Sequence, residues 1–143
     1  MGLFSLTQEL AIDLGTANTL IIHNGRVVVD GVFNHTGNNS RYFNAHGFYP
    51  ELGAAQSRES PYYSWYSFHP WPDDYDAWWG IKTLPAVQES TDSYRRFIIR
   101  DHDSVVRHWL RQGASGWRLD VADELPDDFI AEIRDAMEQE NPD

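Results

Sequence analysis

The stretch "DSVVRHWLRQGASGWRLDVADELPDDFIAEIRDAM" (Asp103–Met137) decides the fold. Its apolar residues first recur three and four positions apart, which predicts an amphipathic helix with an Asp able to cap its start and Gly113 suited to its end. Residues 116–123, "GWRLDVAD", are typical of a strand, and Pro126 with its acidic neighbours favours the first turn of a second helix. The apolar faces of the two helices are formed by Val105, Val106, Trp109 and Leu110, and by Phe129, Ile130, Ile133 and Met137.

A β-rich segment precedes this stretch. Residues 9–14 and 19–23 are two short runs separated by "GTAN", and the Asn24-Gly25 pair is a strong hairpin signal before "RVVVD". The opening therefore predicts a β-meander whose last strand ends at Asp30. Together with the helix, strand and helix that follow, it gives a βαβα order, which is typical of a parallel sheet or a (β/α) barrel.

Residues 37–82 differ in character from both neighbouring segments. They are rich in Gly, Pro, Asn and Ser and contain "PYYSWYSFHPWPDDYDAWW" (residues 61–79). No helical or strand period persists there, and loops of this length are usually functional or disordered. So many aromatic residues argue against disorder, so we expect an ordered insertion whose rings mostly pack its own core.

Composition narrows the classes of partner. The 143 residues fit one domain, lack cysteine and carry a net charge of -11. Such a chain repels nucleic acid and anionic membranes, whereas a neutral ligand such as a sugar is indifferent to the charge. The first ten residues contain no Lys or Arg and so lack the basic region of a signal peptide, from which we expect a cytoplasmic protein.

Polar side chains gather where two of the expected strands end. Alternation along a strand places Arg118 and Asp120 on one face, where a cation favours an ionised, oriented carboxylate of the kind that acts as a nucleophile. Asp30 ends the run before the insertion, and Asn34 and His35 follow it in the loop. Active-site residues of (β/α) barrels lie at these strand ends, so the combination predicts a glycan cleft. Taken singly, Arg118 and Asp120 are better explained as a rim salt bridge and His35 as a structural histidine, so the prediction rests on their combination.

Four motifs in this order resemble the α-amylase family of glycosidases, glycoside hydrolase family 13, and within it the neopullulanase and maltogenic-amylase branch. They are "DGVFNHTG" (30–37), "WWGIKTLPAVQE" (78–89), the helix "DSVVRHWLRQGASG" (103–116) and "GWRLDVADELPDDFI" (116–130). The resemblance implies a partial TIM barrel over residues 30–143. It would hold the third and fourth strands with their helices and an inserted subdomain at about residues 37–97.

The resemblance also implies catalytic roles. Asp120 would be the nucleophile that forms the glycosyl-enzyme intermediate, and Arg118 would hold it ionised. Retaining glycosidases need a second carboxyl as general acid. In this family the acid is a Glu on the fifth strand, which these residues do not include. We therefore expect weak or no hydrolysis of α-1,4-linked glucans by this chain alone.

Substrate-binding roles are implied for four further residues. His35 would bond to the sugar at the cleavage point, Asp30 and Asn34 would brace the site, and Glu124 would bind the acceptor sugar. Asn34 also stands where some family members bind calcium, but Gln88 replaces the Asn or Asp expected after "LP". We therefore expect no cofactor, with calcium left open.

Residues 1–29 resemble a different family. "QELAIDLGTANTLIIHNGRVVV" (8–29) is similar to the N-terminus of bacterial actin-like cytoskeletal proteins. That resemblance would place Asp13 near magnesium and the backbone of Gly15–Asn18 against phosphates. An edge hairpin with a glycine-containing turn is the simpler alternative. The passage from one family to the other inside one strand, without a linker, suggests recombination, a built chimera, or a synthetic or mis-joined sequence.

Several hypotheses therefore remain. The first is a truncated glycosidase segment that acts on an α-glucan or maltooligosaccharide. The second is a non-catalytic module that binds maltooligosaccharide through the insertion. The remaining two are an actin-like nucleotide-binding fragment and a chain without activity. Because a partial barrel leaves strand edges open, self-association is a further expectation.

Overall fold

The computed structural model describes residues 11–14, 19–23 and 25–142. Gly15–Asn18, which the actin-like resemblance assigns to a phosphate loop, lies outside them.

Four strands form a single sheet in the order β1-β2-β3-β4. They are β1 (Ala11–Leu14), β2 (Thr19–His23), β3 (Arg26–Gly31) and β4 (Gly116–Leu119). The first three are antiparallel neighbours, which confirms the predicted meander, and β4 pairs parallel to β3. The long connection between β3 and β4 contains the insertion and a helix, as a parallel crossover requires. The predicted α/β class is therefore confirmed, with β1 and β4 as the edges of the described sheet.

The strand predicted over residues 116–123 is shorter than expected. β4 ends at Leu119 because Val121 adopts a left-handed backbone conformation, with φ 42°, and the short turn η4 (Ala122–Glu124) follows. Asp120 consequently stands just beyond the end of β4. Its side chain is therefore free to face the loops that follow the strands.

Both predicted helices are present. They are α2 (Val105–Arg111) and α3 (Asp127–Glu140), and Gly113, with φ 103°, follows the end of α2 as expected. The expected Asp cap is wrong, because Ser104 occupies the N-cap of α2 and donates its hydroxyl to the Ile99 carbonyl, at 2.9 Å. None of the helices in the described part of the chain has the length and apolar character needed to cross a bilayer.

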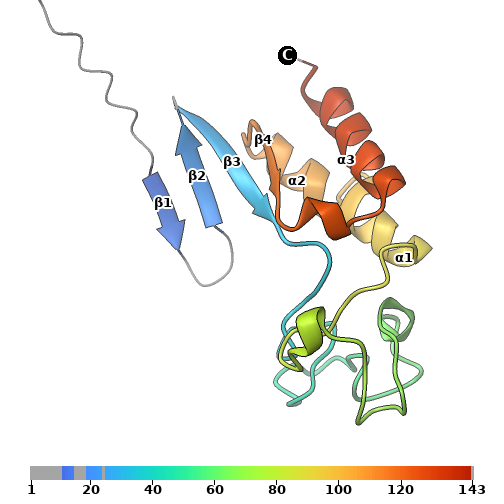
Figure 1. The fold of residues 1–143 in the computed structure, drawn as a ribbon. Coiled ribbons are helices and arrows are strands. Elements are labelled where there is room, and N and C mark those ends of the chain that lie inside the picture. Colours follow the sequence, from blue (N-terminus) through green and yellow to red (C-terminus); the bar gives the residue numbers. More distant parts are fainter. Residues whose placement is uncertain (1–10, 15–18, 24, 143) are drawn as a thin grey trace, which may run out of the picture.

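A further helical segment lies where the sequence predicted the end of the insertion. It consists of α1 (Asp92–Arg95) and the π-helical turn η3 (Arg96–Arg100). Arg95, whose side chain is only 7% exposed, donates Nη1 to Asp128 at 2.8 Å and to Glu132 at 2.9 Å, and so ties α1 to α3. The helices gather at the β3–β4 end of the sheet (Figure 1).

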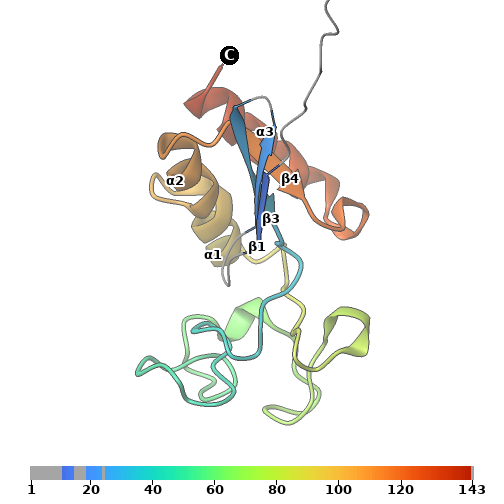
Figure 2. The same ribbon diagram turned by 90° about the vertical axis from the view of Figure 1, so that its left-hand side faces the viewer.

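The inserted segment forms a lobe beyond the carboxyl ends of β3 and β4 (Figures 1 and 2). Its regular structure is limited to the short turns η1 (Tyr63–Trp65) and η2 (Trp78–Gly80) and isolated bridges such as His35–Ala86. The lobe is therefore held by side-chain packing, with Phe43 fully buried among aromatic neighbours such as Tyr66, at a centroid distance of 4.9 Å.

One continuous hydrophobic cluster joins the lobe to the helices. Phe129 of α3 is fully buried, and its ring lies 6.2 Å from that of Phe33 and 6.3 Å from that of Tyr94. Other members are Phe43, Trp65, Tyr66, Val87, Ile98, Ile99, Val106, Leu110, Leu125 and Ile133. Most aromatic residues of the lobe thus pack a core, as expected, whereas Trp79 stands 77% exposed.

Candidate active site

The ends of β3 and β4 bring a cation between two carboxylates. The register places Asp30 opposite Arg118, and Arg118 Nη1 lies 2.8 Å from Asp30 Oδ1 and 2.7 Å from Asp120 Oδ1. The hydrogen bond to Asp30, followed by the charges of both carboxylates, raises the pKa of Arg118. The backbone N–H of Asp120 also donates to the Gly31 carbonyl at 3.0 Å, which joins the two strand ends.

The predicted alternation along β4 is confirmed. Arg118 and Asp120 contact each other on one side, while Trp117 and Leu119 pack against the hydrophobic cluster on the other. The Asp120 side chain is 26% exposed and that of Asp30 is 17% exposed. Asp120 is therefore oriented by its neighbours and still open to a ligand.

Asn34 connects the loop after β3 to the turn after β4. Its side chain is buried, and Nδ2 donates to Glu124 Oε2 at 2.9 Å. Because a carboxylate only accepts, the amide oxygen of Asn34 faces His35 Nδ1, 2.8 Å away. His35 must then carry its proton on Nδ1, which leaves Nε2 as an acceptor.

Burial lowers the pKa of His35, although the charges of Asp120 and Glu124 oppose this shift. The ring is therefore neutral at neutral pH. The charges of Asp120 and Glu124 both act on this ring, so the Asp30–Arg118–Asp120 group and the Asn34–His35–Glu124 group lie in one region. The structure thus brings together all six residues that the sequence predicted.

Two tryptophans, to which the sequence analysis assigned no individual role, complete this region. The His35 ring stacks on the Trp78 ring, and the Trp78 ring stacks on the Trp79 ring, with ring centroids 5.0 Å apart in each pair. Trp78 Nε1 donates to Glu124 Oε2 at 2.9 Å, and Trp79 Nε1 donates to Glu124 Oε1 at 3.3 Å. The two adjacent tryptophans in the motif over residues 78–89 were a signal that could have pointed to these residues. Nothing in the sequence, however, linked them to Glu124.

A pocket of about 300 Å³ opens beside this aromatic stack. Its lining residues are Asn34, Ala77, Trp78, Trp79, Ala86, Val87, Glu89 and Glu124. Burial raises the pKa of Glu89; its own backbone N–H and Arg95 oppose the rise, and Glu124 adds to it. We call this space the stack pocket. It combines flat aromatic faces with carboxyl and amide groups.

The residues around Asn34 do not match a calcium site. Calcium takes six to eight oxygen ligands, usually with several carboxylates among them. The Asn34 oxygen faces the His35 ring, and in the described residues no group of three or more acidic or histidine side chains is arranged so that it could hold a metal ion. The donor set therefore does not fit the ion.

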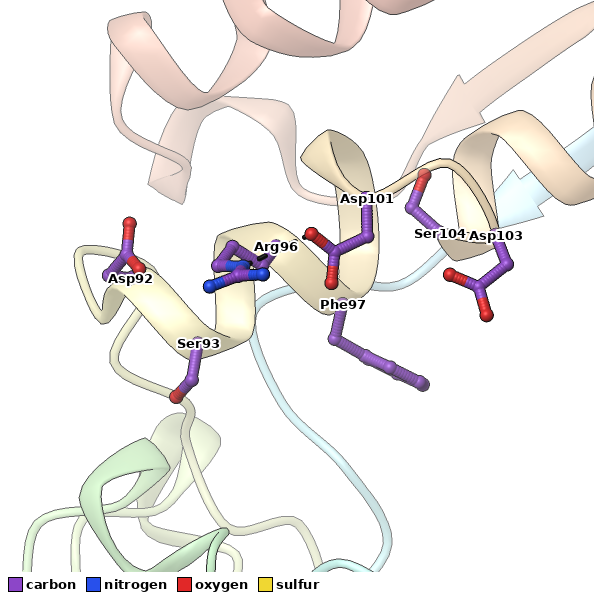
Figure 3. A pocket seen from close by; sticks show the side chains of 7 residues that line it. All are labelled: Asp92, Ser93, Arg96, Phe97, Asp101, Asp103 and Ser104. Atoms are coloured by element: carbon purple, nitrogen blue, oxygen red, sulfur yellow. Dashed lines mark hydrogen bonds and ion pairs between the residues drawn. The ribbon is translucent and has the colours of Figure 1, made fainter.

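A second pocket, of about 410 Å³, lies along α1, η3 and the start of α2 (Figure 3). Its lining residues are Asp92, Ser93, Arg96, Phe97, Asp101, Asp103 and Ser104. Arg96 Nε donates to Asp101 Oδ1 at 3.1 Å, so the arginine that lines this pocket is already paired with a carboxylate. It contains none of the predicted site residues.

Comparison with known proteins supports the family expected from the motifs. Residues 20–143 match the family model of the α-amylase catalytic domain. The chain belongs to the α-amylase family. An amylopullulanase of Thermoanaerobacterium saccharolyticum is 35% identical over 98% of this α-amylase-family chain, and the intracellular maltogenic amylase of Bacillus subtilis strain 168 is 27% identical over 82%.

Solved structures agree on the fold. The type III pullulan hydrolase of Thermococcus kodakarensis matches 82% of this α-amylase-family chain with 30% identity and a TM-score of 0.68, over 20% of its own length. A protein of Thermus thermophilus, Ttha1563, matches 82% with 36% identity and a TM-score of 0.68, over 24% of its length. The parallel β3–β4 pair and its helices thus have the fold of part of an α-amylase catalytic domain.

The α-amylase-family chain spans only a small share of its curated relatives, 12% of the Thermoanaerobacterium saccharolyticum amylopullulanase and 19% of the Bacillus subtilis maltogenic amylase. Because the first alignment takes in 98% of the chain, it extends into residues 1–29. The actin-like resemblance of those residues stays a hypothesis. Cytoplasmic location, chimeric origin and self-association likewise stay predictions.

Proposed function

We propose that this chain carries the nucleophile half of a retaining site for α-1,4-glucosidic bonds, with Asp120 as the nucleophile. The observation that carries the proposal is the position of Asp120 at the end of β4, 2.7 Å from an Arg118 that Asp30 holds from the neighbouring strand. An ionised carboxylate fixed in this way can attack an anomeric carbon and form a glycosyl-enzyme ester.

The neighbouring residues suit the binding of sugar hydroxyls. His35 is neutral and offers Nε2 as an acceptor, while Asn34 fixes the ring through Nδ1. Asp30 acts through Arg118 and is a positioning residue. Glu124 extends the site from η4 towards Trp78 and Trp79. The ligand class that fits these groups is an α-glucan or maltooligosaccharide, which agrees with the sugar-acting relatives.

Within this proposal, β3 and β4 are the third and fourth strands of the family's barrel, and residues 37–97 are the inserted subdomain that precedes the fourth strand. Residues 1–29 form the leader and residues 30–143 the barrel segment. A retaining site needs a second carboxyl roughly 5 Å from the nucleophile to protonate the leaving oxygen. The family supplies it from the fifth strand, so we expect these 143 residues alone to hydrolyse ordinary glucans weakly or not at all.

The experiment uses a substrate whose leaving group needs no proton. With an α-maltosyl fluoride bearing a second ring fluorine, Asp120 forms a C–O bond at the anomeric carbon while the C–F bond breaks and fluoride leaves. We expect intact-mass analysis to show a covalent adduct on the unaltered chain and none on Asp120→Asn. Asp123→Asn, which removes the exposed carboxyl of η4 outside the proposed set, should still form it. An adduct that persists in Asp120→Asn would overturn the proposal.

A second function has its own supporting observation. Trp79 is 77% exposed and stacks on Trp78, which is the arrangement of a platform for a sugar ring. We therefore propose, as the alternative function, that the chain binds maltooligosaccharide without cleaving it. Binding that survives Asp120→Asn but fails in Trp79→Ala, with no adduct from the fluoride, would favour this function.

A further inference from the structure

The stack pocket has the size and chemistry of a subsite for one sugar unit. Its volume of about 300 Å³ is at the lower end of the range for small-molecule pockets, about 300–1,000 Å³. The exposed indole ring of Trp79, which stacks on Trp78, offers a face for the C–H surface of a pyranose, and the pocket lining also includes the carboxyl groups of Glu89 and Glu124, which can accept hydrogen bonds from hydroxyls.

The two carboxyl groups differ in how many hydrogen-bond acceptor sites they have left. Glu124 Oε2 already accepts from Asn34 and Trp78, and Oε1 accepts from Trp79. A carboxylate has about four lone-pair sites, so three are in use. In the described residues, the hydrogen bond from a side chain to Glu89 goes to its backbone carbonyl, which accepts from Arg95 Nε at 2.7 Å, so the Glu89 carboxyl keeps most of its acceptor capacity.

We propose that Glu89 is a specificity-determining residue of this subsite, where it accepts hydrogen bonds from the hydroxyls of a bound glucose unit, while Glu124 positions the two tryptophans. The inference rests on the proposed function, because it assumes an α-glucan as ligand. Glu89 is the last residue of the motif over residues 78–89, and neither the resemblance nor the proposed function gives it a role.

The charged groups around Glu89 come from two elements. Arg95 of α1 donates Nε to the Glu89 carbonyl at 2.7 Å, but its guanidinium is also engaged by Asp128 and Glu132. From η4, Glu124 lines the same pocket. Half-burial, reinforced by Glu124, raises the pKa of Glu89. Since the ionised carboxylate is the better acceptor, affinity for a sugar should rise as pH increases through this raised pKa.

The test is a calorimetric titration of the full chain with maltotriose over a pH series from the ordinary carboxyl pKa to neutrality. We expect the unaltered chain to bind more weakly at the acid end. Glu89→Gln should lose roughly tenfold or more in affinity at neutral pH, as expected for a hydrogen bond to a charged group, and should lose the pH dependence that this carboxyl causes. Glu59→Gln, an isosteric change in the lobe outside the pocket lining, should match the unaltered chain.

The outcomes separate this inference from the proposed function. Equal affinity and an unchanged pH profile in Glu89→Gln would overturn the inference while the fluoride adduct at Asp120 still stood. Failure of the unaltered chain to bind maltotriose would overturn the inference too, and the adduct would then decide the proposed function separately. If Glu89→Gln loses its dispersed amide spectrum, Glu89→Asp is tested instead. It should bind more weakly than the unaltered chain but keep the pH dependence, and unchanged affinity would overturn the inference.

Discussion

Arg118 Nη1 lies 2.8 Å from Asp30 Oδ1, across the parallel pair β3–β4, although 88 positions separate the two residues in the chain. The contact exists because the register pairs these two residues at the strand ends. Parallel neighbours present the side chains of paired residues on the same face of a sheet. Asp30 on β3 thereby holds the Arg118 guanidinium in place against Asp120, which follows β4. The residues of β4 alone would not supply this second contact.

Removal of this cation should slow the chemistry of Asp120. We expect Arg118→Met to form the fluoride adduct about a hundredfold more slowly, because the nucleophile loses the group that orients it. Time-resolved intact-mass analysis measures the rate. The matched control is Arg134→Met, which removes an arginine from an exposed pair with Glu138, whose two side chains are 79% and 62% exposed, and should leave the rate unchanged. Equal rates for Arg118→Met and the unaltered chain would contradict the assigned role.

The tautomer and charge of His35 are open to measurement by NMR. Burial lowers the pKa of His35, so the ring should titrate below the ordinary histidine value of about 6.5 and carry its proton on Nδ1. In Glu124→Gln the midpoint should fall further, because the Glu124 charge raises this pKa. A midpoint that rises in this variant would contradict the geometry.

The same shift has a consequence for stability. Folding lowers the pKa of His35, so the folded chain favours the neutral ring. The resulting contribution to the free energy of unfolding is fully present above the pKa of the unfolded chain, and it is lost as pH falls through the pKa of the folded chain. The folded chain should therefore lose stability on mild acidification. His35→Gln, a neutral replacement, should show a smaller loss over the same range in urea unfolding.

The core beneath the site should be sensitive at Phe129. This ring is fully buried, and Phe33, Tyr94 and Arg95 surround it. We expect Phe129→Ala to cost about 3–5 kcal/mol of unfolding free energy, through lost burial and the cavity that remains. Urea unfolding followed by tryptophan fluorescence measures the change.

Phe48→Ala is the matched control, because the Phe48 side chain is 70% exposed. It should change the unfolding free energy by less than about 0.5 kcal/mol. Similar costs for the two variants would mean that the described core does not stabilise the chain in solution.

Local spacing was sufficient to predict most of the regular structure. The apolar period gave α2 and α3, the Asn-Gly turn and β-rich runs gave the meander, and alternation placed Arg118 and Asp120 together. The short helix α1 and the turn η3 were missed although Thr91 at the N-cap and Asp92 in the first turn are start signals, because the segment is too short to show an apolar period. Their burial comes from Tyr94, Ile98 and Ile99, whose partners lie on other elements.

The sequence by itself determined the α-amylase family, the α/β class and the six side chains of the candidate site, because each depends on residues close together within a motif. The tertiary structure alone decided which partners those side chains contact. Glu124 meets Asn34, Trp78 and Trp79 across 90, 46 and 45 positions of chain. Such contacts set the tautomer of His35, through the Asn34 amide that Glu124 orients. They arise from packing between distant segments, on which the spacing of residues along the chain carries no information.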